Sequence, residues 1–161
     1  MGNWMNAKGR RKRPSGVWVQ HRMLESPNYR ALSTKAVKLL FDVAAGFRGN
    51  NNGDFSVTWS LMKERGWKSK SQMEEALSEL QHYGFLEKTR QGGRHRASLY
   101  AMTWESIDDC KGKLDVGPTR TPSNLWMEER PPFVPRRKRK TKKLPRHAGQ
   151  STPRLGVISA N

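Results

Sequence analysis

The spacing of hydrophobic and polar positions predicts a helix over residues 33–47. Apolar side chains recur there at intervals of three and four residues, which places them on one helix face: Ala36, Leu39, Leu40 and Val43. Ser33 or Thr34 can accept hydrogen bonds from the N–H groups of the first turn. Gly46 and Gly49 end the pattern, and a turn-rich connector follows over residues 49–54.

Two further helices are predicted, of which the second has the clearer signals. Residues 55–57 alternate like a short strand, and Thr58 is expected to cap a two-turn helix over residues 59–65 that Gly66 ends. The next helix begins near residue 70, where Ser71 with Glu74, or Ser69 with Gln72, fits a capping box. Its buried stripe consists of Met73, Ala76, Leu77 and Leu80. Gly84 can adopt the left-handed conformation that ends such a helix.

A β-hairpin is predicted after this helix, with strands at residues 85–90 and 97–104. The turn between them, residues 91–96, combines two glycines with basic side chains. A two-stranded hairpin is marginal alone, so it must pack on the helices. Five apolar side chains can supply the packing face: Phe85, Leu86, Leu99, Tyr100 and Trp104. Trp59 and Trp67 are also expected in the core rather than as platforms for stacked bases.

Charge divides the chain of 161 residues, whose formal net charge is +17, into three parts. Residues 1–16 carry basic residues and no acids, residues 17–116 carry 15 basic and 12 acidic residues, and residues 117–161 carry 11 and 2. We expect a basic N-terminal arm over 1–16, a folded domain over 17–116, and a Pro-rich basic tail over 117–161. The tail is expected to be mostly disordered, because it cannot bury enough apolar surface to offset its ordering entropy. Leu125 to Met127 is a candidate docking patch within it.

The order of elements resembles that of the winged helix-turn-helix family. Helix, short strand, helix, tight turn, helix and basic hairpin follow one another over residues 32–104, with residues 17–31 as a leading segment. Four motifs are similar to those of helix-turn-helix proteins from bacterial mobile elements, including phage and plasmid replication-associated or regulatory proteins: Asn51-Asn52-Gly53, Gly84-Phe85, Gly92-Gly93-Arg94 and Thr103-Trp104. The resemblance implies an α+β fold, a small winged helix-turn-helix domain of three helices plus a β-hairpin wing that binds DNA.

The start of the last predicted helix is the first candidate for contact with DNA. An α-helix fits the major groove and contacts bases mainly from its N-terminal part. The candidate residues are Lys68, Ser69, Lys70, Ser71, Gln72 and Glu75. The lysines suit phosphates, and Gln72 can pair with adenine. Glu74, Glu75 and Glu79 would repel phosphates along the helix, so we expect either insertion of the helix tip alone or contact mainly through the hairpin.

The hairpin and the two basic flanks supply the remaining candidates. A glycine turn lets the backbone approach the minor groove or a phosphate, and an arginine there favours a narrow groove. The hairpin candidates are Lys88, Arg90, Arg94, His95 and Arg96. The flanks can add affinity that does not depend on base sequence, by releasing counterions from DNA. Their candidates are Arg10, Arg11, Lys12, Arg13, Arg136, Arg137, Lys138, Arg139, Lys140, Lys142 and Lys143. The alternatives are a merely solvated hairpin tip and a tail that anchors any polyanion, including RNA.

Motifs of enzymes and metal sites are missing from the sequence. The four histidines and the single cysteine, Cys110, lack metal-ligand spacing. No phosphate-binding glycine loop and no nucleophile elbow occur. Asp108 and Asp109 would raise the pKa of the Cys110 thiol, which makes it a poor nucleophile. We therefore expect no catalysis, no cofactor and no metal.

The sequence thus predicts a non-enzymatic protein that binds double-stranded DNA sequence-specifically, as a transcriptional regulator of a bacterial or mobile-element genome. Recognition of a plasmid or phage origin in replication is one alternative, and an RNA- or protein-binding module within a larger nucleoprotein assembly is another. A homodimer would match palindromic sites, and the replication or transcription machinery is the further expected partner. The single cysteine, and the lack of a membrane span or secretory signal, favour a cytoplasmic, nucleoid-associated protein and no membrane contact.

Overall fold

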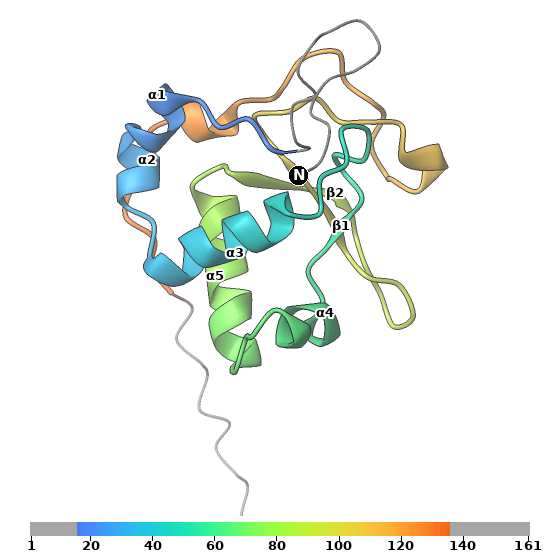
Figure 1. The fold of residues 1–161 in the computed structure, drawn as a ribbon, viewed down its shortest axis with the longest axis horizontal. Coiled ribbons are helices and arrows are strands. Elements are labelled where there is room, and N and C mark those ends of the chain that lie inside the picture. The colour runs from blue at the N-terminus through green and yellow to red at the C-terminus, as the bar shows by residue number, and fades with distance from the viewer. Residues whose placement is uncertain (1–15, 136–161) are drawn as a thin grey trace, which may run out of the picture.

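A mixed α+β fold of five α-helices and one three-stranded antiparallel sheet forms from residues 16–135, the part of the chain that the computed structural model describes (Figure 1). The elements in chain order are α1 (His21–Leu24), α2 (Pro27–Arg30), α3 (Thr34–Ala44), β1 (Phe55–Ser56), α4 (Trp59–Glu64), α5 (Lys70–His82), β2 (Leu86–Arg90), β3 (Leu99–Met102) and the 3-10 turns η1 (Cys110–Gly112) and η2 (Leu125–Met127). Helix α3 crosses α5, and the sheet lies beside this pair (Figure 1). Within residues 16–135, none of the helices combines the length and apolar character needed to cross a bilayer.

The longer helices lie close to their predicted positions, and serine side chains cap both. The Ser33 hydroxyl accepts a hydrogen bond from the Ala36 N–H at 3.2 Å and so begins α3. Ser69, and not Ser71, caps α5, since its hydroxyl accepts from the Gln72 N–H at 3.4 Å. Helix α3 ends at Ala44, short of the predicted residue 47, because the following residues turn back with i→i+3 bonds.

The sheet has the order β1–β3–β2, so the predicted hairpin gains a third strand. Phe55 of β1 pairs with Tyr100 of β3, and Leu86 of β2 pairs with Met102. All four residues of β3 are buried, because this central strand has a neighbour on each side and both of its faces are covered. The extra strand supplies the support that a hairpin alone would lack.

Asn52 joins the connector after α3 to the end of β3. Its side chain is 0% exposed, and its Nδ2 donates to the carbonyls of Met102 at 2.9 Å, Glu105 at 3.0 Å and Ser106 at 3.0 Å. Its Oδ1 accepts from the Met102 N–H at 2.8 Å. The Asn-Asn-Gly motif therefore has a structural role here, because it satisfies buried backbone groups at the sheet edge.

Residues 117–135 belong to the folded unit, which corrects the predicted boundary at residue 116. Trp126 is 3% exposed, and the buried Asn28 side chain donates to the carbonyls of Trp126 at 2.8 Å and Glu128 at 2.6 Å. The Oδ1 of Asn28 also accepts from the Arg130 N–H at 3.2 Å. We call residues 124–135 the strap. The predicted arm residues before Gly16 and after Pro135 lie outside the described residues.

Candidate nucleic-acid interface

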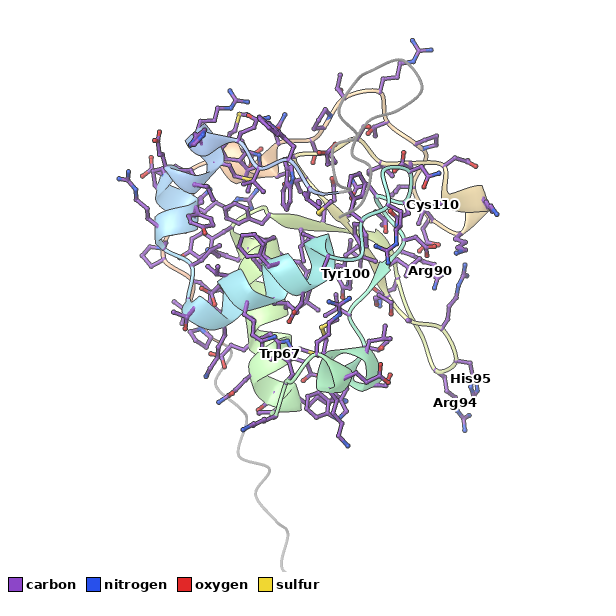
Figure 2. The ribbon with its side chains drawn as sticks, viewed as in Figure 1. Trp67, Arg90, Arg94, His95, Tyr100 and Cys110 are labelled. Carbon is purple, nitrogen blue, oxygen red and sulfur yellow. The ribbon has the colours of Figure 1, made fainter. Side chains whose placement is uncertain are left out.

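The turn between α4 and α5 is fixed to α3 by a buried tryptophan (Figure 2). The Trp67 Nε1–H donates to Asp42 Oδ2 at 2.7 Å, and the Lys38 ammonium contacts the same oxygen at 2.6 Å. Lys38 also lies 5.1 Å from the centre of the Trp67 ring and donates to the Arg65 carbonyl at 3.1 Å. Trp67 is a core residue, as predicted, and these contacts hold the start of α5 in a defined position.

The start of α5 presents most of its predicted residues to solvent. The exposed members are Lys68, Lys70, Gln72 and Glu75, whereas Ser69 and Ser71 are half-buried with their hydroxyls 3.2 Å apart. The positive end of the helix dipole adds to the charge of the two lysines. This end of α5 therefore presents positive charge to solvent.

The three glutamates of α5 have different environments. Glu79 is 7% exposed, and its carboxylate accepts from the Ser33 N–H at 2.6 Å and from the Ser33 hydroxyl at 2.7 Å. Glu79 thus caps α3 and does not face a ligand. Glu74 lies 3.7 Å from the Lys70 ammonium, in an exposed pair of small energetic value. Of the three glutamates expected to repel phosphates, only Glu74 and Glu75 are therefore exposed.

The strap covers the surface beside the second half of α5. The His82 Nε2–H donates to the Pro131 carbonyl at 2.7 Å, and the Phe133 N–H donates to the Tyr83 hydroxyl at 3.0 Å. The Phe133 ring also lies 5.5 Å from the His82 ring. The strap approaches the turn after α5 so closely that a Cβ on Gly84 would meet the backbone of Leu125 at 2.5 Å. The strap therefore covers one side of α5, and its last residues, Val134 and Pro135, line grooves that also include Ser71 and Gln72 near the start of the helix.

The tip of the β2–β3 hairpin projects from the body on the side of α4 (Figures 1 and 2). Arg94, His95 and Arg96 are exposed on it, and the Gly93 N–H donates to the Arg96 carbonyl at 2.7 Å across the turn. A Cβ on Gly92 would lie 2.4 Å from the Ser98 nitrogen and 2.6 Å from the Arg96 oxygen. Residue 92 is therefore the position in this turn where a side chain does not fit.

Arg90 has a largely structural position, unlike the residues at the tip. Its Nη2 donates to the Ala97 carbonyl at 3.0 Å, and its Nη1 donates to the Lys113 carbonyl at 3.2 Å. Arg96 reaches the same Lys113 oxygen at 3.5 Å. These bonds bring a loop with the exposed Lys111 and Lys113 beside the hairpin. Sequence reasoning missed both lysines, because no periodicity or spacing links this loop to the hairpin.

Lys88 faces a different part of the molecule from Arg90. It is exposed, donates to the Gln91 side chain at 2.9 Å, and lines a groove of about 790 Å³ together with Ser71, Ser78 and the strap residue Val134. Lys88 therefore lies between the hairpin and the outward face of α5, and not at the hairpin tip.

Cys110 lies in an acidic and partly buried environment (Figure 2). Burial first, and then the carboxylates of Asp54 and Asp108, raise the pKa of its thiol. The thiol is therefore protonated at neutral pH and weakly nucleophilic. Over residues 16–135, no three His, Cys, Asp or Glu side chains gather into an arrangement that could hold a metal ion. No family model, curated protein or solved structure matches this chain.

Proposed function

We propose that this chain is a non-enzymatic protein that binds double-stranded DNA through a winged helix-turn-helix domain. In this proposal α4, the turn at Trp67 and α5 form the helix-turn-helix, and the β2–β3 hairpin is the wing. The observation that carries it is the placement of two exposed basic elements, the start of α5 and the hairpin tip, on the same side of the fold as α4 (Figure 1).

The start of α5 is proposed to enter the major groove, which is wide enough to admit a helix. Lys68 and Lys70 are proposed to contact phosphates at the groove edge, and Gln72 is proposed to contact a base, for which adenine is the best geometric partner. Arg94 and His95 at the hairpin tip are proposed to contact the flanking phosphates or the minor groove.

The exposed acids of α5 favour sequence-specific over general binding. Glu74 and Glu75 oppose any phosphate that lies along the second turn of the helix. The domain therefore favours the orientation in which this turn faces base edges, where a glutamate can accept a hydrogen bond from cytosine N4. A general polyanion-binding surface would lack such acids at its centre.

Selection from a random duplex library tests the proposal. The full chain and a fragment of residues 16–135 are each used to select duplexes at near-physiological salt. We expect both proteins to enrich the same motif. Two inverted half-sites in the motif would identify a homodimer. Its occurrence beside promoters would identify a transcriptional regulator, and its repetition at an origin a replication protein. Selection without any motif, or preference for structured RNA over duplexes, would overturn the proposal.

Arg94→Ala tests the role assigned to the hairpin tip. Loss of one phosphate contact is expected to reduce the slope of log affinity against log salt by about one. Arg48→Ala, an exposed arginine on the connector after α3, is the matched control and should leave the slope unchanged. If Arg94→Ala and Arg48→Ala give the same salt slope, Arg94 makes no phosphate contact, and the wing is not part of the interface.

A further inference from the structure

The first part of the strap is fixed on the domain. The Trp126 side chain is 3% exposed, and the Arg22 guanidinium lies 5.5 Å from the centre of its ring. The Asn28 side chain makes three hydrogen bonds with the strap backbone, and the last of them is accepted from the Arg130 N–H at 3.2 Å. Residues 124–130 are therefore an anchor from which the rest of the strap extends.

Residues 131–135, which we call the cover, have fewer contacts than the anchor. The His82 Nε2–H donates to the Pro131 carbonyl at 2.7 Å, and the Phe133 N–H donates to the Tyr83 hydroxyl at 3.0 Å. Between described residues, these two are the hydrogen bonds that hold the cover. A neutral hydrogen bond of this kind makes a modest net contribution. The cover can therefore leave the domain while the anchor stays in place.

The cover lies on the face of α5 that points away from the core. The Phe133 ring lies 5.5 Å from the His82 ring. His82 follows the buried Met73 by nine positions, and at about 3.6 residues per turn this spacing places the two side chains on opposite faces of the helix. The cover is therefore in contact with the outward face of α5.

The last two residues of the cover extend this path toward the start of the helix. The Val134 side chain is 80% exposed and lines a groove of about 790 Å³ together with Ser71. Pro135 lines a groove of about 690 Å³ together with Gln72 and Glu75. The cover thus reaches the turns of α5 that are proposed to face base edges.

A duplex and the cover need the same space. An α-helix with its side chains is about 10–12 Å across, and the major groove is about 12 Å wide. A groove that is filled by α5 cannot also hold an extended chain on the outward face of this helix. The duplex can therefore reach Gln72 and Glu75 from the outward side only after the cover has moved.

We infer that the cover is an autoinhibitory element, which lies on α5 in the free protein and leaves it when a duplex enters. The inference rests on the proposed function, since it concerns the same helix face. Only the fraction of the protein in which the cover has left α5 can bind, so the measured affinity is reduced by this fraction. A change that weakens the contacts of the cover increases the fraction and strengthens duplex binding.

Tyr83→Phe tests the cover, because it removes the hydroxyl that binds Phe133 and leaves the buried ring in place. The affinity of the full chain is measured for the duplex enriched by selection and for a duplex of random sequence. We expect the variant to bind both duplexes about three- to tenfold more tightly, which corresponds to the loss of one neutral hydrogen bond. Tyr29→Phe, at a ring that packs against Phe85, is the matched control and should leave both affinities unchanged.

Amide exchange provides a direct measurement of the position of the cover. The Phe133 N–H is hydrogen-bonded in the free protein, so we expect its exchange to become faster when the duplex is added. The Met102 N–H, which donates to the Asn52 side chain at 2.8 Å in the sheet, is the control and should stay protected. Faster exchange at Phe133 alone would show that the cover leaves a domain that remains folded.

The cover and the proposed function can fail separately. An enriched motif with equal affinities for Tyr83→Phe and the parent chain, or a Phe133 amide that stays protected in the complex, would overturn the cover alone. Tighter binding of Tyr83→Phe to both duplexes, with no motif enriched, supports the cover and overturns sequence-specific recognition. No binding of either duplex by the parent chain or the variant would overturn both proposals.

Discussion

Glu79 is the one of the three acids of α5 whose side chain is buried, and it stabilises the fold. From the sequence it is one of three acids on α5 that would repel phosphates along the helix. In the structure its carboxylate accepts two hydrogen bonds from Ser33, which lies 46 residues earlier in the chain. No local pattern could reveal this contact, because it depends on how α3 crosses α5.

Glu79→Ala should lower the free energy of unfolding by about 2–3 kcal/mol, since it removes the two charge-assisted hydrogen bonds that the buried Glu79 carboxylate accepts from the start of α3. Glu75→Ala, on the exposed face of the same helix, should change stability by less than about 0.5 kcal/mol. It should also strengthen binding to a duplex of random sequence, because it removes a negative charge near the phosphates, and it should reduce the preference for the selected motif, because a glutamate contact to a base edge is lost. Urea denaturation and a duplex titration of both variants check these expectations. Similar stability losses for the two variants would contradict the capping role of Glu79.

Glu105 provides a prediction about pH. Burial first, and then the nearby Asp108 carboxylate, raise the pKa of Glu105 above its ordinary value of 4.5. The folded state therefore binds this proton more tightly than the unfolded state does, so its contribution to stability decreases as pH rises from 4.5 through the raised pKa. Glu105→Gln removes the titration, and it should increase stability at pH 7 relative to the parent chain.

The same comparison below about pH 4, where the carboxyl is protonated in both states, should show little gain. Glu25→Gln, at the exposed end of α1, controls for the general effect of removing one acid from the chain. A gain of equal size at both pH values would contradict the assigned role of Glu105.

At the scale of elements, the local sequence pattern predicted those helices and strands that form through local interactions. Helices α3 and α5 and strands β2 and β3 follow from periodicity, serine caps and glycine ends. Helices α1 and α2 were missed as helices because one turn of four residues has no measurable periodicity. The short strand β1 was predicted, but its pairing with β3 depends on the tertiary fold. The α+β class was therefore predictable, whereas the third strand of the sheet was not.

The hairpin tip offers a test that leaves its charged residues unchanged. Gly92→Ala would push a Cβ against the Ser98 and Arg96 backbone, so the turn must open. Overpacking of this kind typically costs about 1–3 kcal/mol. Gly93→Ala is the matched control, because a Cβ there meets nothing within 4 Å. We expect weaker duplex binding and faster amide exchange over residues 90–98 for the first variant only. Equal exchange in both variants would show that the turn tolerates the extra carbon.

At the scale of the whole molecule, sequence composition gave a wrong prediction for residues 117–135, which were expected to belong to a disordered tail. Its prolines and basic residues are typical of a solvated tail, and one tryptophan adds little to its average hydrophobicity. Yet residues 117–135 complete the fold through contacts that span the chain, such as the bond from Asn28 to Trp126 across 98 positions. The candidate residues on α5 and the hairpin could be identified from charge and motif. Only the structure shows which of these candidate residues are exposed and which form contacts that hold the fold together.

The folded length of the domain determines how truncations must be interpreted. A chain ending at residue 116 lacks the buried Trp126 and leaves the Asn28 side chain without its partners. Loss of a buried tryptophan costs about 3–5 kcal/mol, a large part of the roughly 5–15 kcal/mol that stabilises a domain. We expect residues 16–116 to unfold at much lower urea concentration than residues 16–135, and Trp126→Ala in the full chain to lose a similar amount. Weak DNA binding by the shorter fragment would then report unfolding and not the loss of a basic tail. Equal urea midpoints for the two fragments would mean that the strap adds nothing to stability, which its buried tryptophan and three Asn28 hydrogen bonds argue against.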